Sequence, residues 1–227
     1  MIRRAIKIVG WAIAAYVAAV VLLIALYAFV PPVSTLMLMR WVTGERVVRQ
    51  WRPIEAISPN LVHAVVVSED ARICTHSGVD WQEVREAIAD AEELADARGA
   101  STIAMQTARN LFLWPGRQVV RKALEVPIAY AITFAWSPRR VIEVYLNIAQ
   151  WGPNGEFGAE AASQRAFKKS AASLTQREAA LLAASLPNPV RRNAARPGPG
   201  LQRVAATAVA RAASDGGAAV NCLKLRP

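Results

Sequence analysis

The sequence has few residues of the kinds that cross-link small folds or bind metals. Its 227 residues include only two cysteines, Cys74 and Cys222, and two histidines, His63 and His76. The cysteines lie far apart and form no CxxC pair, which excludes a disulfide framework and a zinc site of clustered Cys and His. Charged residues make up 19% of the chain and hydrophobic residues 54%, a composition that excludes a disordered protein. The chain therefore folds around an apolar core or inserts into a membrane.

Long runs of alternating apolar and polar residues, which indicate half-buried strands, are also lacking. Capping and stop signals instead predict helices over residues 61–69, 80–99, 119–135, 137–149, 175–187 and 201–213, and another that opens at Ser101 or Thr102. Residues 151–158 and 187–199 are expected to be loops, and residues 214–227 a frayed tail. We therefore predict a mainly α-helical domain.

One uncharged run stands near the N-terminus. Residues 8–30 form 23 positions without a charge, and as a helix they span about 34 Å, enough to cross a hydrocarbon layer of about 30 Å. Three cations, Arg3, Arg4 and Lys7, precede the run on the short segment 1–7, so the N-terminus is expected to stay cytoplasmic. A cleaved signal peptide is the less favoured alternative because its apolar region is usually shorter. We predict a single-pass anchor with the rest of the chain outside the cytoplasm.

The charge of the chain is unevenly distributed. The net charge is +10, yet residues 55–97 hold ten acidic residues against two arginines, and residues 163–227 carry +9. Such a basic surface attracts an anionic partner, which could be nucleic acid, a phospholipid surface or a phosphorylated substrate. Residues 31–54 mix apolar side chains with arginines, so this segment is either an amphipathic element in the headgroup region or an ordinary core helix.

Two neighbouring carboxylates end the first helix of the outward part. Glu69 and Asp70 follow an apolar stretch over residues 64–67. A carboxylate at the edge of an apolar helix loses part of its hydration, and this makes a glutamate a usable general base or acid near neutral pH. The alternative is an ordinary helix end with two hydrated carboxylates.

A second group of residues suits an anionic ligand. Gly99, Ser101 and Thr102 lie at a predicted helix start, where free backbone N–H groups favour an anion. Four cations follow within fourteen residues: Arg109, Arg117, Arg121 and Lys122. Glu125 shares a helix face with the last two, which on its own indicates only a surface ion-pair helix. Together with Glu69, these residues indicate a site for a pyrophosphate leaving group with carboxylates beside it.

Four ordered motifs carry a resemblance to glycosyltransferase family 51. Residues 69–78 resemble its E-D-x-x-F-x-x-H-x-G motif, residues 99–106 its G-x-S-T-I-T-Q-Q motif, residues 121–125 its R-K-x-x-E motif, and residues 141–147 its I-L-E-x-Y-L-N motif. The departures are Ile73 in place of Phe, Ala104 and Met105 in place of Thr and Gln, and Arg109 where lysine is common. A fifth motif, R-x-x-Y-F-x-K, is met only loosely by residues 164–169, so no site residue is assigned there.

The resemblance implies a lysozyme-like helical glycosyltransferase domain over residues 55–213, after the anchor. It implies polymerisation of lipid II, with inverting transfer of the growing glycan from undecaprenyl pyrophosphate to the 4-hydroxyl of an incoming lipid II and formation of β-1,4 bonds. Glu69 would be the general base, and Glu125 would stabilise the donor side. The residues expected to bind substrate are Asp70, Ser101, Thr102, Gln106, Arg109, Arg117, Arg121, Lys122, Tyr145 and Asn147. His76 is expected to make a structural hydrogen bond rather than to act as a catalyst.

The same resemblance implies the setting of the reaction. The domain would be periplasmic, on a bacterial inner membrane, in cell-wall biogenesis and the maintenance of cell shape. Expected partners are lipid II, the lipid-linked glycan chain, membrane phospholipid and cell-wall synthesis or division proteins, and no nucleic acid. No cofactor is expected to be required, although Mg²⁺ or Mn²⁺ could assist at the pyrophosphate. No lysine lies three residues after a serine, so a transpeptidase nucleophile motif is missing.

Two other functions stay open at this point. A lytic glycosidase on the same scaffold also needs a glutamate of raised pKa, but cleaving an uncharged glycosidic bond needs no cluster of cations. A non-catalytic envelope scaffold would use the basic surface for anionic lipid and would give Glu69 and Glu125 no role. The cysteines could pair in an oxidising compartment, but Cys74 lies within the first motif and Cys222 in the expected tail, so we expect them to be unpaired.

Overall fold

The computed structural model describes residues 1–89, 101–116 and 119–225. Its α-helices are α1 (Ile2–Tyr27), α2 (Thr35–Val42), α3 (Pro59–Glu69), α4 (Trp81–Ala89), α5 (Ile103–Phe112), α6 (Val119–Ala135), α7 (Pro138–Ile148), α8 (Gly158–Phe167), α9 (Gln176–Ser185) and α10 (Pro199–Asp215). Shorter elements are the 3-10 helices η1 (Ile54–Ala56), η3 (Ala171–Ser173) and η4 (Ala218–Leu223) and the strands β1 (Val48–Arg49) and β2 (Glu156–Phe157). The predicted mainly α-helical fold is confirmed.

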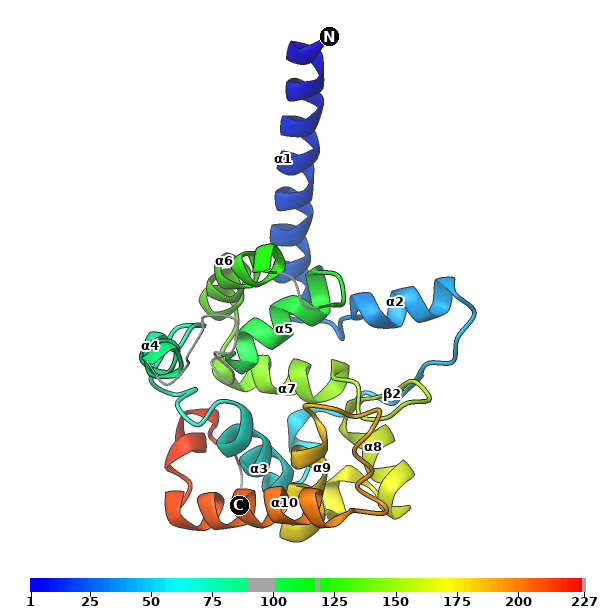
Figure 1. The fold of residues 1–227 in the computed structure, drawn as a ribbon, viewed down its shortest axis with the longest axis vertical. Coiled ribbons are helices and arrows are strands. Elements are labelled where there is room, and N and C mark those ends of the chain that lie inside the picture. The colour runs from blue at the N-terminus through cyan, green and yellow to red at the C-terminus, as the bar shows by residue number, and fades with distance from the viewer. Residues whose placement is uncertain (90–100, 117–118, 226–227) are drawn as a thin grey trace.

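Helix α1 projects from the rest of the molecule as a single long rod (Figure 1). It is long and apolar enough to cross a membrane. It begins at Ile2 and ends at Tyr27, so the last three residues of the predicted span 8–30 lie beyond its end. Its lower turns are fixed to the domain, because the Tyr16 hydroxyl donates to the carbonyl of Phe112 at 3.0 Å and Trp136 Nε1 donates to the carbonyl of Ile24 at 2.8 Å.

The apolar core is built around α3. This helix is apolar on all sides, and Leu61, Val65 and Val66 are fully buried, as expected for a helix surrounded by others. It packs against α9 and α10, while α5 packs against α6 and α7. The end of α3 and the start of α5 meet between these two groups, and α1 rises from the side of α5 and α6 (Figure 1).

Two elements in the second half of the chain were not predicted. Helix α8 follows directly on β2, and its N-cap residue Phe157 offers no capping side chain, so the usual start signal is missing. Strand β2 lies within the predicted loop 151–158 and pairs in parallel with β1, with Val48 opposite Glu156. Strands of two residues are too short to show an alternating pattern. The predicted helix 80–99 is observed as α4, and residues 90–99 lie outside the described part.

The frayed tail predicted for the C-terminus is wrong where the structure describes it. Gly216 and Gly217 adopt φ angles of +60° and +92°, which glycine adopts readily, and they turn the chain after α10 into η4. Leu223 on η4 is fully buried. Cys222 forms a disulfide with Cys74, with a Cα–Cα distance of 5.6 Å. The expectation of unpaired cysteines was therefore wrong, because the chain reversal brings together residues that are far apart in sequence.

Candidate active site

Three of the predicted site residues form one hydrogen-bonded chain. Glu69 is the last residue of α3, and its carboxylate accepts a hydrogen bond from Nε2 of Gln106 on α5 at 2.9 Å. Oε1 of the same amide accepts the hydroxyl of Tyr145 on α7 at 3.0 Å. Tyr145 is almost fully buried. Residues from the first, second and fourth motifs thus meet at the end of α3.

The surroundings of Glu69 raise the pKa of its carboxyl group above the ordinary value. Burial is the largest cause, because it removes water from the charged form. The hydrogen bond from Gln106 and the charges of Arg109 and Arg192 act in the opposite direction, and the nearby Asp70 adds to the rise. A carboxylate whose pKa lies closer to neutrality accepts a proton more readily from a hydroxyl group.

Asp70 is buried and holds neighbouring backbone in place. Its Oδ2 accepts the N–H of Ile103, the first residue of α5, at 2.9 Å. Its Oδ1 lies 2.8 Å from Nε2 of His76. This confirms that His76 makes a structural hydrogen bond. Both oxygens of Asp70 are thus engaged within the protein, and the residue joins the end of α3 to the start of α5.

The hydroxyls at the start of α5 have different partners. Thr102 caps the helix by accepting the N–H of Met105 at 3.1 Å, and its hydroxyl donates to the carbonyl of Gly78 at 2.5 Å. Thr102 is buried, so it fixes the helix start. Ser101 is half-buried, and its hydroxyl accepts a hydrogen bond from Lys122 on α6. Gly99, from the same motif, lies outside the described residues.

A buried carboxylate lies beside the cations of α6. Glu125 is 1% exposed and forms ion pairs with Arg121 and Lys122, the latter at 3.4 Å. Burial lowers the pKa of Lys122, although the charge of Glu125 opposes this shift and the charges of Arg109 and Arg121 add to it. The charges of Arg109 and Arg121 therefore influence Lys122. The buried carboxylate of Glu125 pairs with Arg121 and Lys122.

Two of these cations, Arg109 and Arg121, line a groove near the base of α1. The groove has a volume of about 290 Å³, and Arg109, Arg121 and Asn110 line it together with Thr35 and the apolar Leu113. Helix α2 forms one wall, since the Thr35 hydroxyl donates to the carbonyls of Asn110 and Leu113 at 3.1 and 2.7 Å. A cationic groove next to an apolar helix suits a ligand with an anionic head and a lipid tail.

Two of the residues predicted to bind substrate are not among those that the structure brings together around Glu69 and the cationic groove. Asn147 is fully buried, and its side chain bonds both backbone groups of Arg52 and the carbonyl of Glu143, each at 2.8 Å. It fixes the segment before η1 rather than facing the groove. Arg117 lies outside the described residues.

Arg192 was not predicted, although its charge acts on Glu69. It lies in the segment between α9 and α10, and its Nη1 donates to the carbonyl of Ala184 near the end of α9 at 2.7 Å. Because α9 packs on α3, this bond holds the guanidinium near the end of α3. No motif marks the position, and only the packing of α9 on α3 reveals it.

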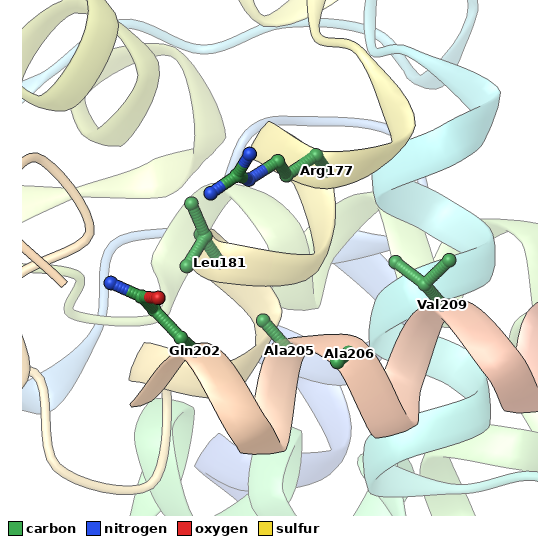
Figure 2. Close-up of a pocket in the computed structure, with 6 residues that line it drawn as sticks. All are labelled: Arg177, Leu181, Gln202, Ala205, Ala206 and Val209. Carbon is green, nitrogen blue, oxygen red and sulfur yellow. The ribbon is translucent and has the colours of Figure 1, made fainter. Parts of the chain in front are cut away.

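A second cavity lies away from this group. It has a volume of about 400 Å³ and lies between α9 and α10, where Arg177, Gln202 and small or apolar side chains line it (Figure 2). None of the predicted site residues that the structure describes lines it. Among the described residues, no three His, Cys, Asp or Glu side chains are grouped closely enough to hold a metal ion.

Comparisons with known proteins agree with this arrangement. The family model described as transglycosylase matches residues 36–213. A biosynthetic peptidoglycan transglycosylase of Nitrobacter winogradskyi is 53% identical over 210 residues, which cover 92% of this chain and 93% of that protein. Proteins of the same name from Rhodopseudomonas palustris strain HaA2 and Agrobacterium fabrum are each 54% identical, over 93% and 86% of this chain and 94% and 87% of their own lengths.

The fold and the site define a helical enzyme with an apolar N-terminal helix that is long enough to cross a membrane. Its partly buried glutamate is influenced by the charge of Arg109, which lines a cationic groove. With the family model covering most of the chain, the protein belongs to the transglycosylase family. The resemblance inferred from the four sequence motifs is thereby confirmed.

Proposed function

We propose that this protein polymerises peptidoglycan glycan strands from lipid II. The observation that carries the proposal is that Glu69, whose pKa is raised, is influenced by the charge of Arg109, which lines a cationic groove near the base of the apolar helix. Transfer from a lipid-linked pyrophosphate needs both a base for the acceptor hydroxyl and cations for the leaving group. The relatives named biosynthetic peptidoglycan transglycosylase support the same substrate class.

In the proposed reaction, Glu69 accepts the proton of the 4-hydroxyl of the incoming lipid II. The oxygen of this hydroxyl forms a bond to C1 of the growing glycan, while the bond from C1 to the pyrophosphate breaks and its electron pair leaves with the phosphate. One displacement converts the α-linked donor into a β-1,4 product, so no glycosyl-enzyme intermediate forms. Gln106 orients the carboxylate of Glu69.

The leaving pyrophosphate is assigned to the cationic groove. Arg109, Arg121 and Lys122 would donate charge-assisted hydrogen bonds to phosphate oxygens as negative charge develops. Glu125 holds two of these cations in place, and Ser101 holds Lys122 through its hydroxyl. No cofactor is required in this scheme, since the side chains supply the positive charge. Mg²⁺ or Mn²⁺ bound to pyrophosphate oxygens would add to it.

The proposed location is the bacterial inner membrane, with α1 as the anchor and the domain in the periplasm. Arg3, Arg4 and Lys7 before the apolar residues favour a cytoplasmic N-terminus. The Cys74–Cys222 disulfide is consistent with an oxidising compartment for the domain. In this topology the groove would lie at the periplasmic surface of the inner membrane, where a lipid-linked substrate would present its pyrophosphate.

The segment between the anchor and the domain is proposed to rest on phospholipid. Helix α2 exposes Leu38, Met39, Trp41 and Val42, and it lies beside the base of α1 (Figure 1). Exposed apolar and aromatic side chains next to an anchor suit the headgroup region. Cell-wall synthesis or division proteins are further proposed partners, and nucleic acid is not.

Polymerisation of labelled lipid II by the purified full-length protein in detergent tests the function. The wild type is expected to make high-molecular-weight glycan that lysozyme digests, and Glu69→Gln is expected to make none. Glu83→Gln serves as the control, because it neutralises a glutamate on α4 that is 40% exposed and pairs with Arg72 rather than with Gln106. Wild-type activity in Glu69→Gln would refute the role of Glu69. Shortening of preformed glycan would support a lytic glycosidase instead, and inert proteins that bind anionic vesicles equally would support a scaffold.

A further inference from the structure

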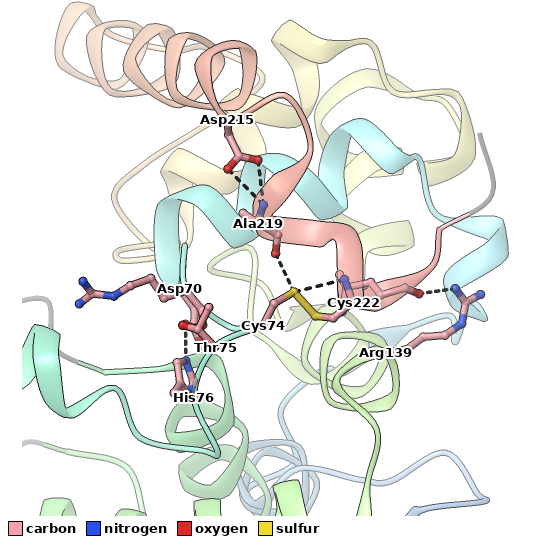
Figure 3. Close-up of a disulfide and its surroundings, with 10 residues drawn as sticks. Asp70, Cys74, Thr75, His76, Arg139, Asp215, Ala219 and Cys222 are labelled. Carbon is pink, nitrogen blue, oxygen red and sulfur yellow. Dashed lines mark hydrogen bonds and ion pairs between the residues drawn. A yellow bond between two sulfur atoms is a disulfide. The ribbon is translucent and has the colours of Figure 1, made fainter.

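Helix η4, in the last described part of the chain, lies against the loop that follows the proposed base. This loop covers residues 70–79, between α3 and α4, and is called the 70–79 loop below. Cys74 in the middle of the loop is bonded to Cys222 on η4 (Figure 3). Cys74 is only five residues beyond Glu69. A covalent bond thus joins the neighbourhood of the proposed base to a segment almost 150 residues away.

Helix η4 is itself fixed to the domain without the disulfide. Both carboxylate oxygens of Asp215 accept the N–H of Ala219, at 3.1 and 3.0 Å (Figure 3). Asp215 also pairs with His63 on α3 at 2.8 Å. Arg139 on α7 donates to the carbonyl of Leu223 at 3.0 Å. Helix η4 is therefore a fixed point that rests on α3 and α7.

The 70–79 loop needs such a fixed point because its ends carry the contacts that shape the site. At one end Asp70 accepts the N–H of Ile103 at the start of α5. At the other end the carbonyl of Gly78 accepts the hydroxyl of Thr102. Between them the loop consists of turns and bends rather than a helix. Its middle is held by two local backbone hydrogen bonds, from Ile73 to Asp70 and from Thr75 to Arg72, and the bond at Cys74 joins it to η4.

We propose that the Cys74–Cys222 disulfide is a positioning bond for the transfer reaction. It holds the 70–79 loop so that Glu69 keeps its contact with Gln106 and Asp70 its contact with α5. The proposal rests on the glycan transfer proposed above. A dithiol such as dithiothreitol supplies two electrons and two protons, becomes a cyclic disulfide, and leaves two thiols on the protein. The reduced protein keeps its fold and loses the geometry around Glu69.

The chain offers a clean test because Cys74 and Cys222 are its only cysteines. Full-length protein in detergent is assayed with lipid II before and after dithiothreitol, and free thiols are counted by mass spectrometry. Reduction is expected to lower kcat on the order of tenfold, as small displacements of catalytic groups do, with little change in KM. The acidic limb of the pH profile is expected to move as well, since it reports on Glu69. Removal of the reductant and addition of oxidised glutathione are expected to restore kcat and the position of the acidic limb.

Two variants complete the experiment. The double variant Cys74→Ser/Cys222→Ser is expected to behave like the reduced wild type and to respond neither to dithiothreitol nor to oxidised glutathione. Gly44→Ala is the stability control, because Gly44 has a φ angle of +72° but lies far in sequence from the loop and has no atom within 4 Å of an added Cβ. Gly44→Ala is expected to lower the melting temperature and to leave the acidic limb of the pH profile of kcat unchanged.

An unchanged kcat and an unchanged acidic limb in a protein with two free thiols would overturn the proposal and leave the bond a purely stabilising role. Inactivity of the oxidised wild type would instead contradict the proposed function. In that case hydrogen exchange decides whether the bond positions the loop. Faster exchange in residues 70–79 on reduction, with residues 81–89 unchanged, would support positioning, and equal exchange in the loop would overturn it.

Discussion

The hydroxyl of Tyr145 determines which atom of the Gln106 amide faces the proposed base. Burial raises the pKa of Tyr145 well above its ordinary value, so the hydroxyl stays protonated and donates to Oε1 of Gln106 at 3.0 Å. The amide nitrogen is then directed at Glu69 and donates to its carboxylate at 2.9 Å. Without the hydroxyl, the amide could turn and present its oxygen to the carboxylate.

Tyr145→Phe is therefore expected to reduce kcat for lipid II polymerisation. The loss of one ordered hydrogen bond corresponds to about 0.5–1.5 kcal/mol, or roughly twofold to thirteenfold in rate. Tyr130→Phe is the matched control, because the Tyr130 hydroxyl bonds Trp81 at 2.7 Å on an exposed part of α6. Equal rates for wild type and Tyr145→Phe would show that the orientation of Gln106 does not matter for the transfer.

The acidic limb of the pH profile is expected to report the ionisation of Glu69. Its pKa is raised above the ordinary value of 4.5 by burial, and as a base it works only in its charged form, so activity falls as the pH drops through the raised pKa. Arg192 lowers this pKa by its charge. Arg192→Gln should therefore move the acidic limb to higher pH.

The neighbouring Arg191→Gln provides the control for that measurement. Arg191 is exposed and has no resolved influence on the pKa of Glu69. The pH profile of the Arg191→Gln variant should overlay that of the wild type. A shift of the same size in both variants would indicate a general effect of net charge rather than a local effect of Arg192.

Residues that the ordered motifs singled out lie together in the structure. Glu69, Gln106 and Tyr145 were all singled out, and the structure joins them through hydrogen bonds. Helix α6 was predicted with its observed bounds. In these cases local signals are strong: caps, stop residues and motif spacing act over a few residues and need no knowledge of the packing.

Other features depend on contacts between distant segments and carry no local signal. Arg192 acts on Glu69 only because α9 packs on α3. The bond between Cys74 and Cys222 requires the turn after α10. Asn147 belongs to a matched motif, yet its side chain forms hydrogen bonds with the backbone N–H and carbonyl of Arg52 in a separate segment. A motif therefore identifies residues that matter without showing whether they face the substrate or hold the backbone.

Glu125→Gln is expected to destabilise the protein as well as to inactivate it. Glu125 is buried between Arg121 and Lys122, and neutralising it leaves two cations without their counter-charge. Removal of one partner from a buried ion pair costs about 3–5 kcal/mol of unfolding free energy. Glu86→Gln is the control, since Glu86 is 55% exposed and pairs with Arg72 at 3.6 Å, and such a surface pair contributes about 0–1 kcal/mol. Urea unfolding measures the unfolding free energy of each variant. Equal losses in Glu125→Gln and Glu86→Gln would contradict the argument that the burial of Glu125 makes its neutralisation costly.

The pairing of His76 with Asp70 is expected to make stability depend on pH. Burial lowers the pKa of His76, but the hydrogen bond to Asp70 and the charges of Asp70, Asp80 and Glu83 outweigh it, so the net shift is upward. The stabilisation is therefore complete below the unfolded value near 6.5 and is lost as the pH rises through the higher folded pKa.

His76→Gln removes this dependence. The difference in melting temperature between wild type and His76→Gln should be larger at pH 6 than at pH 9. The comparison is repeated in a His63→Gln background, where His76 is the only remaining histidine. A difference that is constant with pH would show that His76 contributes no proton-linked stability.

Gly78 occupies a position where a side chain would separate the 70–79 loop from α6. Its φ angle is +92°, and an added Cβ would lie 2.9 Å from the carbonyl oxygen of Ala129 and 3.0 Å from Oγ1 of Thr133. Gly78→Ala therefore combines a strained backbone, at about 1 kcal/mol, with a steric overlap of about 1–3 kcal/mol.

The overlap also displaces the carbonyl of Gly78, which accepts the hydroxyl of Thr102 at the start of α5. Polymerisation should therefore fall further in Gly78→Ala than the loss of folded protein explains. Gly44→Ala isolates the backbone contribution, because Gly44 has a φ angle of +72° with open space around an added Cβ. Thermal unfolding should show the larger loss for Gly78→Ala, and the specific activity of the folded fraction should fall only in that variant. Equal losses of stability and equal specific activities would mean that the loop tolerates displacement from α6, and Gly78 would then matter for its φ angle alone.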